Sequence, residues 1–178
     1  MQARQSLGIR WTVGNLRGRG FEMLRLSIAC AFRVFGRAAS YVVCVNSLSA
    51  EEARLRTGSL PLEVEWREIT VNDISGFLRP HINDEMAEGA CWKLIPLRMF
   101  PDCHELAMDN DCMLWNLPAG LMQWLRNENR CLIAEDVERK LGIFDQLCPA
   151  GCQNSGIRGL PPGFDLQAAI EAVLAAHI

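Results

Sequence analysis

A short acidic segment near the middle of the chain has the residue types and spacing of a divalent-cation site. Asp109 and Asp111 are separated by Asn110 and follow the apolar run Leu106-Ala107-Met108. On an extended chain alternate side chains face the same side, so the two carboxylates would lie together and repel. A hard cation such as Mg²⁺ or Mn²⁺ would relieve this repulsion, because it prefers oxygen ligands and completes its shell with water and phosphate. We therefore predict a metal site at Asp109 and Asp111, placed to hold a diphosphate.

The same three residues are also typical of a turn, because Asp and Asn side chains bond to their own backbone and tolerate left-handed dihedral angles. The flanking sequence favours the metal site over a plain turn. Apolar residues precede the segment up to Met108 and follow it from Cys112 to Trp115. A buried strand ending at Met108 would place the acids at the carboxyl edge of a sheet, where open α/β folds bind ligands.

The composition is that of an ordinary globular domain. Of 178 residues, 49% are hydrophobic and 22% are charged, and the formal net charge is −3. A chain of this length buries enough surface for one core, so we expect a single domain over residues 1–178. The slight acidity argues against nucleic acid as a partner, because proteins that bind the phosphate backbone usually carry a basic excess on one face. No apolar run approaches the roughly 20 residues of a transmembrane helix, so no transmembrane segment is expected.

Eight cysteines are spread along the chain, most of them inside apolar runs such as Tyr41-Val42-Val43-Cys44-Val45. In a chain without a secretion signal, such cysteines are expected to be small buried hydrophobes in a reducing compartment, and we predict a cytoplasmic protein. A structural zinc site in an interaction module is the alternative. It would use the pair Cys148-x3-Cys152 together with Cys103 and His104.

Short apolar, β-branched runs alternate with helical patterns, which predicts an α/β fold with a mainly parallel central sheet. The expected strands are residues 9–13, 41–45, 64–69, 104–108 and 131–134, and residues 112–115 are expected to continue the fourth of these runs in extended form.

Helical periodicity and capping residues place the helices between these strands. A helix is expected over residues 21–35 with Gly36 as its stop, and a second begins with the capping box Ser49 and Glu52 and stops at Gly58. Further helical segments are expected within residues 82–99, after Pro118, around 136–141, and from Asp165 to about 177.

Three further segments complete a pattern around the acidic pair. Lys93 lies 16 residues (109 − 93) before Asp109, and Glu135-Asp136 and Asn154-Ser155-Gly156-Ile157 come after it. In this order the chain resembles the GT-A glycosyltransferases, nucleotide-diphospho-sugar transferases whose DxD motif follows an apolar strand. The segment around Lys93 is similar to the helix that carries a lysine near the sugar nucleotide in glycogenin-like members.

The resemblance implies a GT-A-like, Rossmann-like three-layer sandwich with a mainly parallel central sheet. Residues 9–111 would form the nucleotide-sugar half and residues 112–178 the acceptor half. It implies a metal-dependent, hexosyltransferase-type reaction that moves a sugar from a nucleotide-diphospho-sugar donor to a hydroxyl-bearing acceptor. The cofactor would be Mn²⁺ or Mg²⁺.

The roles that the resemblance implies fall on particular residues. Asp111 would bind the metal, and Asp109 would contact the ribose or, through water, the metal. The donor would be contacted by Thr12, Gly14, Asn15, Lys93, Asp109, Asn110, Asn154, Ser155 and Gly156. Glu135 or Asp136 would be the general base of an inverting enzyme, although two such acids are also typical of the first turn of a helix. Lys93 would stabilise the departing diphosphate, unless it is a surface lysine whose aliphatic stem covers apolar residues.

Two other functions stay open at this point. A non-catalytic relative would bind a nucleotide sugar or a partner on the same fold. A metal-dependent phosphohydrolase also uses paired aspartates, but the haloacid-dehalogenase pattern places them after the first strand and before Thr or Val, whereas Cys112 follows here. Arg98 and Arg158 are further candidates for bidentate binding of a phosphate or of an acceptor carboxylate.

Overall fold

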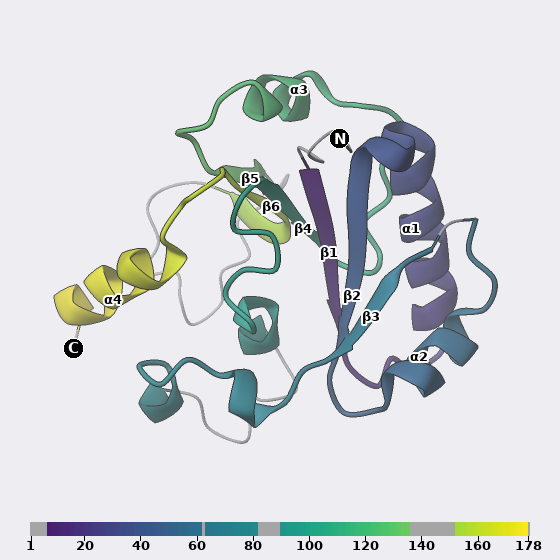
Figure 1. Cartoon of the computed structure of the whole chain (residues 1–178), viewed down its shortest axis with the longest axis horizontal. Helices are drawn as coiled ribbons and strands as arrows, with labels where there is room; N and C mark the ends of the chain where they lie inside the picture. Colours follow the sequence, from purple (N-terminus) through teal and green to yellow (C-terminus); the bar gives the residue numbers. More distant parts are fainter. Residues whose placement is uncertain (1–6, 62, 82–89, 136–151, 178) are drawn as a thin grey trace.

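The fold is built on one mixed sheet (Figure 1). A computed structural model of the chain describes residues 7–61, 63–81, 90–135 and 152–177. In this described part the six strands are ordered β3-β2-β1-β4-β6-β5. Their bounds are Leu7–Val13 (β1), Ala39–Val45 (β2), Glu65–Glu68 (β3), His104–Met108 (β4), Leu132–Glu135 (β5) and Gln153–Leu160 (β6). Strands β1 to β4 are mutually parallel, whereas β6 is antiparallel to both of its neighbours. The expected α/β fold with a mainly parallel sheet is confirmed.

The central strands are covered on both faces, as their sequence requires. In β2 the side chains from Val42 to Val45 are fully buried, including both faces of the alternating chain. A continuous run of small and β-branched apolar residues suits such a strand, because neither face can carry a polar side chain to water. Val13 of β1 pairs with Val45, and Trp11 pairs with Met108. The carboxyl ends of β1, β2 and β4 therefore lie at the same edge of the sheet.

The helices begin and end close to the expected residues. Their bounds are Gly20–Phe35 (α1), Ala50–Thr57 (α2), Ala119–Leu125 (α3) and Leu166–His177 (α4). Gly36 closes α1 with a positive φ of 56°, which glycine adopts without steric cost. The Ser49 hydroxyl accepts from the backbone N–H of Glu52 at 3.1 Å, and the carboxylate of Asp165 caps α4 in the same way. Only half of the expected capping box forms, because the Glu52 carboxylate pairs with Arg56 instead.

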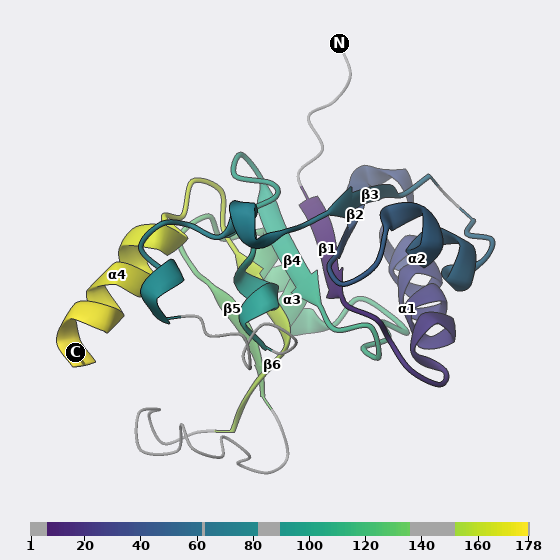
Figure 2. The ribbon, with the colours of Figure 1, turned by 90° about the horizontal axis from the view of Figure 1, so that it is seen from below.

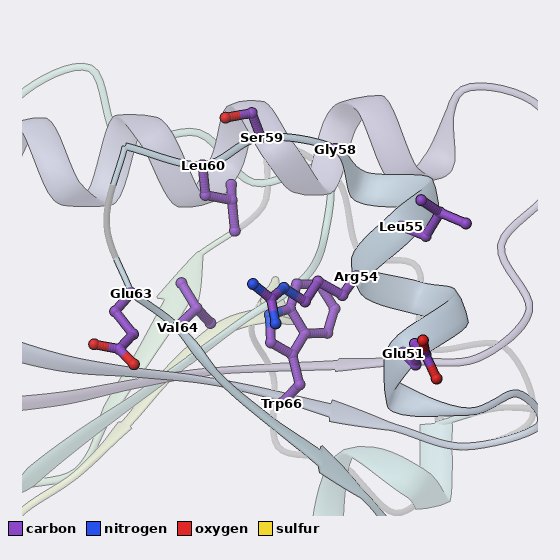
Figure 3. A pocket seen from close by; sticks show the side chains of 9 residues that line it. All are labelled: Glu51, Arg54, Leu55, Gly58, Ser59, Leu60, Glu63, Val64 and Trp66. Atoms are coloured by element: carbon purple, nitrogen blue, oxygen red, sulfur yellow. The ribbon is translucent and has the colours of Figure 1, made fainter.

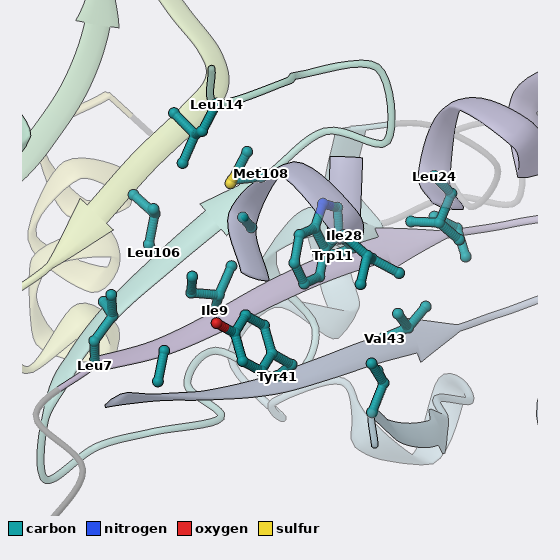
Figure 4. Packing of buried hydrophobic residues seen from close by; sticks show 14 of the residues in the cluster. Leu7, Ile9, Trp11, Leu24, Ile28, Tyr41, Val43, Leu106, Met108 and Leu114 are labelled. Atoms are coloured by element: carbon teal, nitrogen blue, oxygen red, sulfur yellow. The ribbon is translucent and has the colours of Figure 1, made fainter. Parts of the chain in front are cut away.

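One face of the sheet is covered by α1, α2 and α3. Figure 4 shows Trp11 of β1 beside Ile28 of α1, with Leu24 further along the helix. Leu24 and Ile28 lie one helical turn apart and are fully buried, which is the apolar stripe that the sequence predicts. Trp124 of α3 belongs to the same buried cluster. The three helices thus form one outer layer of the sandwich.

The opposite face is covered differently. Its buried cluster contains Trp92 and Ile95, with Ile170 and Leu174 of α4 packed against it. Three 3-10 helices contribute to this layer, with bounds Val71–Asp73 (η2), Arg79–His81 (η3) and Ala90–Leu94 (η4). Helix α4 lies at the end of the molecule away from α1 and α2 in both ribbon views (Figures 1 and 2). The third layer of the sandwich is therefore made mainly of 3-10 turns and loops, with one α-helix at its end.

The structure differs from the expected elements in two places, one of them a wrong expectation and the other a strand that was not predicted. Residues 112–115 form no strand, and they cross toward α1 instead, where the guanidinium of Arg33 donates to the carbonyl of Trp115. Strand β6 was not expected, because Asn154 and the glycines at 156 and 159 are poor strand formers. The helix expected around 136–141 and residues 82–89 lie outside the described residues. Within the described ranges, no helix is long and apolar enough to cross a bilayer.

Candidate functional site

The acidic segment follows β4 directly, at the edge where the parallel strands end. β4 stops at Met108, and the backbone N–H of Cys112 donates to the carbonyl of Asp109 at 3.1 Å. Residues 109–112 therefore form a turn, and the expectation that Asp109 and Asp111 alternate on an extended chain is wrong. The turn chemistry of Asp and Asn prevails over the apolar flanks, because β4 has reached the sheet edge. The Asp111 side chain is exposed, whereas Asp109 is half-buried.

Lys93 and Asp109 form an ion pair, which the sequence analysis did not predict. The Nζ atom of Lys93 donates to Oδ2 of Asp109 at 2.7 Å, and the two side chains are 27% and 29% exposed. Lys93 lies in the last turn of η4, in the layer that covers the second face of the sheet. The lysine is therefore not a plain surface residue, because its ammonium reaches across this layer to the acidic turn.

Two arginines hold the backbone of Lys93 in place. Its carbonyl oxygen accepts from Nη2 of Arg10 at 2.9 Å, and it also accepts from Nη2 of Arg158. Arg10 belongs to β1 and Arg158 to β6, the strands on either side of β4. The pKa of Arg158 is lowered to about 10, mainly by burial and also by the positive charge of the nearby Arg10 guanidinium. The guanidinium groups of Arg10 and Arg158 therefore lie close together beneath the Lys93–Asp109 pair.

Arg98 is occupied structurally, which removes it as a candidate for phosphate or acceptor binding. Its guanidinium contacts the Glu105 carboxylate at 3.3 Å. It also donates to the carbonyls of Phe100, Cys103, Pro161 and Phe164 at 2.9 to 3.1 Å. These acceptors use the donor capacity of the guanidinium, because five N–H groups are all that an arginine offers. Arg98 ties β4 to the segment that leads into α4.

The segment Asn154-Ser155-Gly156 reaches the acidic turn from β6. The backbone N–H of Asp109 donates to the carbonyl of Gly156 at 2.8 Å. A Cβ on Gly156 would lie 2.9 Å from Oδ1 of Asn154 and 3.4 Å from Oδ2 of Asp109. The absence of a side chain at 156 therefore lets β6 approach the acids closely. Asn154 accepts from the backbone N–H of Gly156 at 2.7 Å, which shapes this approach locally.

A small polar cavity joins these segments. Its lining includes one residue from each of four segments that the sequence pattern singles out separately. These residues are Thr12, Lys93, Asp109 and Ser155. The remaining lining residues are Arg10, Ala107, Met108 and Arg158. The cavity holds about 10 Å³, close to the space that one water needs. A larger ligand would therefore lie across this edge, with the cavity as its floor.

The strand ends beyond the cavity include one residue that the sequence reasoning missed. Asn46 follows β2 and is 5% exposed, and its Oδ1 has no hydrogen-bond partner among the described residues. A Cβ on Gly14 would lie 2.8 Å from this oxygen. A buried acceptor without a donor is costly, so this oxygen is a natural contact for an N–H of a bound ligand. The position after each parallel strand was the signal that could have found it.

Two residues expected to contact the donor are engaged elsewhere in this structure. Oδ1 of Asn15 accepts from Arg56 of α2 at 2.9 Å. Nδ2 of Asn110 donates to the carbonyl of Gly20 at 3.3 Å, which ties the acidic turn to the start of α1. Both residues lie at the expected edge, but their amide groups hold neighbouring elements together.

The candidate general base lies on the far side of β6. Glu135 ends β5, is exposed, and pairs with Gln153 at the beginning of β6. It is at the same edge of the sheet as Asp109, because β5 and β4 are each antiparallel to β6. Glu135 does not line the small cavity. Its partner in the prediction, Asp136, lies outside the described residues.

A larger hollow, shown in Figure 3, is lined by none of the predicted site residues. It holds about 650 Å³ between the end of α2 and the beginning of β3. Arg54 and Trp66 are its largest lining side chains, with Glu51 and Glu63 beside them. The acidic turn follows the carboxyl end of β4, whereas this hollow adjoins the amino end of β3. The two places are therefore separate features of the fold.

The zinc alternative finds no support in the part of the chain that the structure describes. There, no group of three His, Cys, Asp or Glu side chains is arranged to hold a metal. The His104 ring is buried, packs edge-on against Trp124 at 4.7 Å, and contacts the carbonyl of Asn127 at 3.2 Å. These contacts identify His104 as a core residue. Cys148 lies outside the described residues.

The acidic turn could hold a hard cation only together with ligands from water or from a bound phosphate. Asp109 and Asp111 supply carboxylate oxygens of the kind that Mg²⁺ and Mn²⁺ prefer. Among the described residues, no further His, Cys, Asp or Glu side chain joins them to make a group of three. Mg²⁺ sites commonly use one or two carboxylates and complete their shell with water and substrate phosphates. The donor set therefore fits a cation that arrives together with a phosphate ligand.

Comparison with known proteins adds no family. No protein-family model matches this chain, and no curated protein matches it significantly. The fold places the chain in the α/β class with a mixed, mostly parallel sheet.

Proposed function

We propose that the chain is a metal-dependent glycosyltransferase that moves a sugar from a nucleotide-diphospho-sugar to a hydroxyl-bearing acceptor. The observation that carries the proposal is the lining of the small cavity by Thr12, Lys93, Asp109 and Ser155. These residues come from four separate stretches of sequence, and each was expected to contact the donor. Meeting at the carboxyl edge of the parallel strands is what a nucleotide site in an open α/β fold requires.

The chain's own residues would act mainly on the negative charge of the departing nucleoside diphosphate. The Lys93 ammonium is held at this edge and can donate to a phosphate oxygen. This contact strengthens as the bond to the sugar breaks and charge grows on the leaving group, so it favours the transition state over the bound donor. A divalent cation bound at Asp109 and Asp111 would add charge neutralisation on the same group.

The acceptor side of the reaction rests on Glu135 or Asp136. A carboxylate there would take the proton of the acceptor hydroxyl as the new bond to the sugar forms. Glu135 ends a strand two positions from β4 at the same edge, which is compatible with an acceptor lying beside the donor.

The proposal is tested by calorimetry with uridine and guanosine diphosphate, each with and without Mn²⁺. We expect cation-dependent binding in the wild type and its loss in Asp111→Ala. Asp111 is exposed, so its removal leaves the core intact. The matched control is Asp102→Ala, because Asp102 is also an exposed aspartate in a turn, at the opposite end of β4.

Two results would contradict parts of the proposal. Equal binding in Asp111→Ala and the wild type would remove the metal site. A panel of nucleotide sugars assayed for donor hydrolysis separates an enzyme from a binding protein. Binding without hydrolysis of any donor would leave the non-catalytic alternative on the same fold.

A further inference from the structure

The two acids of the turn differ in their partners. Oδ2 of Asp109 holds the Lys93 ammonium at 2.7 Å, whereas Asp111 is exposed and has no ion pair among the described residues. The lysine therefore occupies one of the carboxylates that a cation would need. A divalent cation reaching this oxygen must first displace the ammonium.

The backbone of Lys93 is held in place, whereas its side chain can change position. Its carbonyl is bonded by Arg10 and Arg158, which fixes the backbone at this position. The side chain is 27% exposed, and within the described ranges its ammonium bonds to one group, the Asp109 carboxylate. Such a contact is weak enough to exchange, because a partly exposed ion pair contributes little net free energy. The ammonium can thus change partner without any rearrangement of the sheet.

The surrounding charge disfavours a bare cation. Arg10 and Arg158 lie beside the Lys93–Asp109 pair in the lining of the cavity, and Arg10 shares the Glu105 carboxylate with Arg98. A free divalent ion would add positive charge to this arrangement. A nucleoside diphosphate brings negative charge with the ion and offers the displaced ammonium a new acceptor.

We propose that Lys93 is a resident counter-ion that excludes a free divalent cation from Asp109 and transfers to the phosphate when the cation arrives with the nucleotide. The inference rests on the proposed function, because it concerns the same site. It makes the binding of cation and diphosphate mutually dependent, each improving the affinity for the other.

The first test measures binding of Mn²⁺ alone, by the electron paramagnetic resonance signal of the free ion. In Lys93→Met we expect about tenfold tighter Mn²⁺ binding than in the wild type, a change typical of a single coupled interaction. With Mn²⁺ present, we expect about tenfold weaker binding of uridine diphosphate in the same variant. The control Arg126→Met removes one exposed positive charge at the end of α3 and should change both affinities less than twofold.

Unchanged or weaker Mn²⁺ binding in Lys93→Met overturns the exclusion, including the case in which neither protein binds the ion. Failure of the proposed function looks different. In that case neither the wild type nor any variant would bind uridine or guanosine diphosphate. The Mn²⁺ measurement would still decide whether Lys93 excludes the free cation from Asp109.

A second readout follows the lysine directly. Lys93 and Lys140 are the only lysines among the 18 basic residues, so labelling lysine with ¹³C at Cε gives two signals, assigned through Lys93→Met. We expect the Lys93 signal to shift on addition of uridine diphosphate with Mg²⁺, and to stay in place with the same concentration of Mg²⁺ alone. A signal that responds equally to Mg²⁺ alone, or that never moves while the nucleotide binds, overturns the transfer.

Discussion

The buried carboxylate of Glu105 is expected to be a main determinant of stability beneath the site. Glu105 and Arg10 are each 2% exposed, and Oε1 of the glutamate lies 3.3 Å from Nε of the arginine. Among the residues that the structure describes, neither atom has a partner of hydrogen-bond geometry, so the contact between them is one of charge. The other carboxylate oxygen accepts from the backbone N–H groups of Met99 and Phe100, at 2.8 Å each, and contacts Arg98 at 3.3 Å.

Glu105→Gln keeps the shape of the side chain and removes its charge. Removing one partner of a buried ion pair typically costs about 3–5 kcal/mol, because the other charge is left buried and unpaired. The amide oxygen can still accept from the two backbone N–H groups, so we expect the lower end, about 3 kcal/mol. With an m-value of about 2 kcal/mol/M, the midpoint of urea unfolding should fall by roughly 1.5 M.

Equilibrium urea unfolding followed by tryptophan fluorescence measures this change. The matched control is Glu52→Gln, which also breaks a glutamate–arginine pair, but one in which the glutamate is 46% and the arginine 42% exposed. That change should cost less than about 0.5 kcal/mol, because water and salt screen an exposed pair. If Glu105→Gln costs no more than the control, the carboxylate does not balance the charge of the buried arginines, and the electrostatic account of this layer is refuted.

Two further predictions concern residues around the acidic turn. Ser27→Ala should destabilise the fold by about 1–3 kcal/mol in the same unfolding experiment. The Trp11 indole N–H donates to the Ser27 hydroxyl at 2.9 Å, and in this variant it would be left buried without an acceptor. Ser27→Thr keeps the hydroxyl and should retain more of the stability; equal losses in the two variants would contradict a stabilising role for this hydrogen bond. Burial raises the pKa of the Cys112 thiol, and Asp109 and Asp111 raise it further, so Asp111→Asn should make this thiol react faster with iodoacetamide near pH 9, measured peptide by peptide by mass spectrometry. An unchanged rate would mean that the Asp111 carboxylate does not act on the thiol.

The local pattern of the sequence is sufficient for most of the regular elements. The apolar run of β2 must be buried on both faces, which predicts a central strand. The periodic apolar stripe of α1 must be buried along one side, which predicts an amphipathic helix. The stops and caps at Gly36, Ser49 and Asp165 also follow from local chemistry, since each satisfies backbone groups within a few residues.

The elements that the sequence did not reveal depend on distant partners. Strand β6 exists because its backbone pairs with β4 and β5, which compensates for the weak strand propensity of its own residues. Residues 112–115 leave the sheet although they are apolar, because their path is set by contacts with α1. Neither outcome is encoded in a window of a few residues.

The candidate site divides in the same way. The residue types and their order along the chain were enough to single out Lys93, Asp109 and Ser155. Their meeting in one cavity, the pairing of Lys93 with Asp109, and the occupation of Arg98 by Glu105 and four carbonyls were decided by the tertiary structure. The physical reason is that a side chain's chemistry belongs to the residue, whereas its partners depend on which strands lie side by side, and that is a property of the whole sheet.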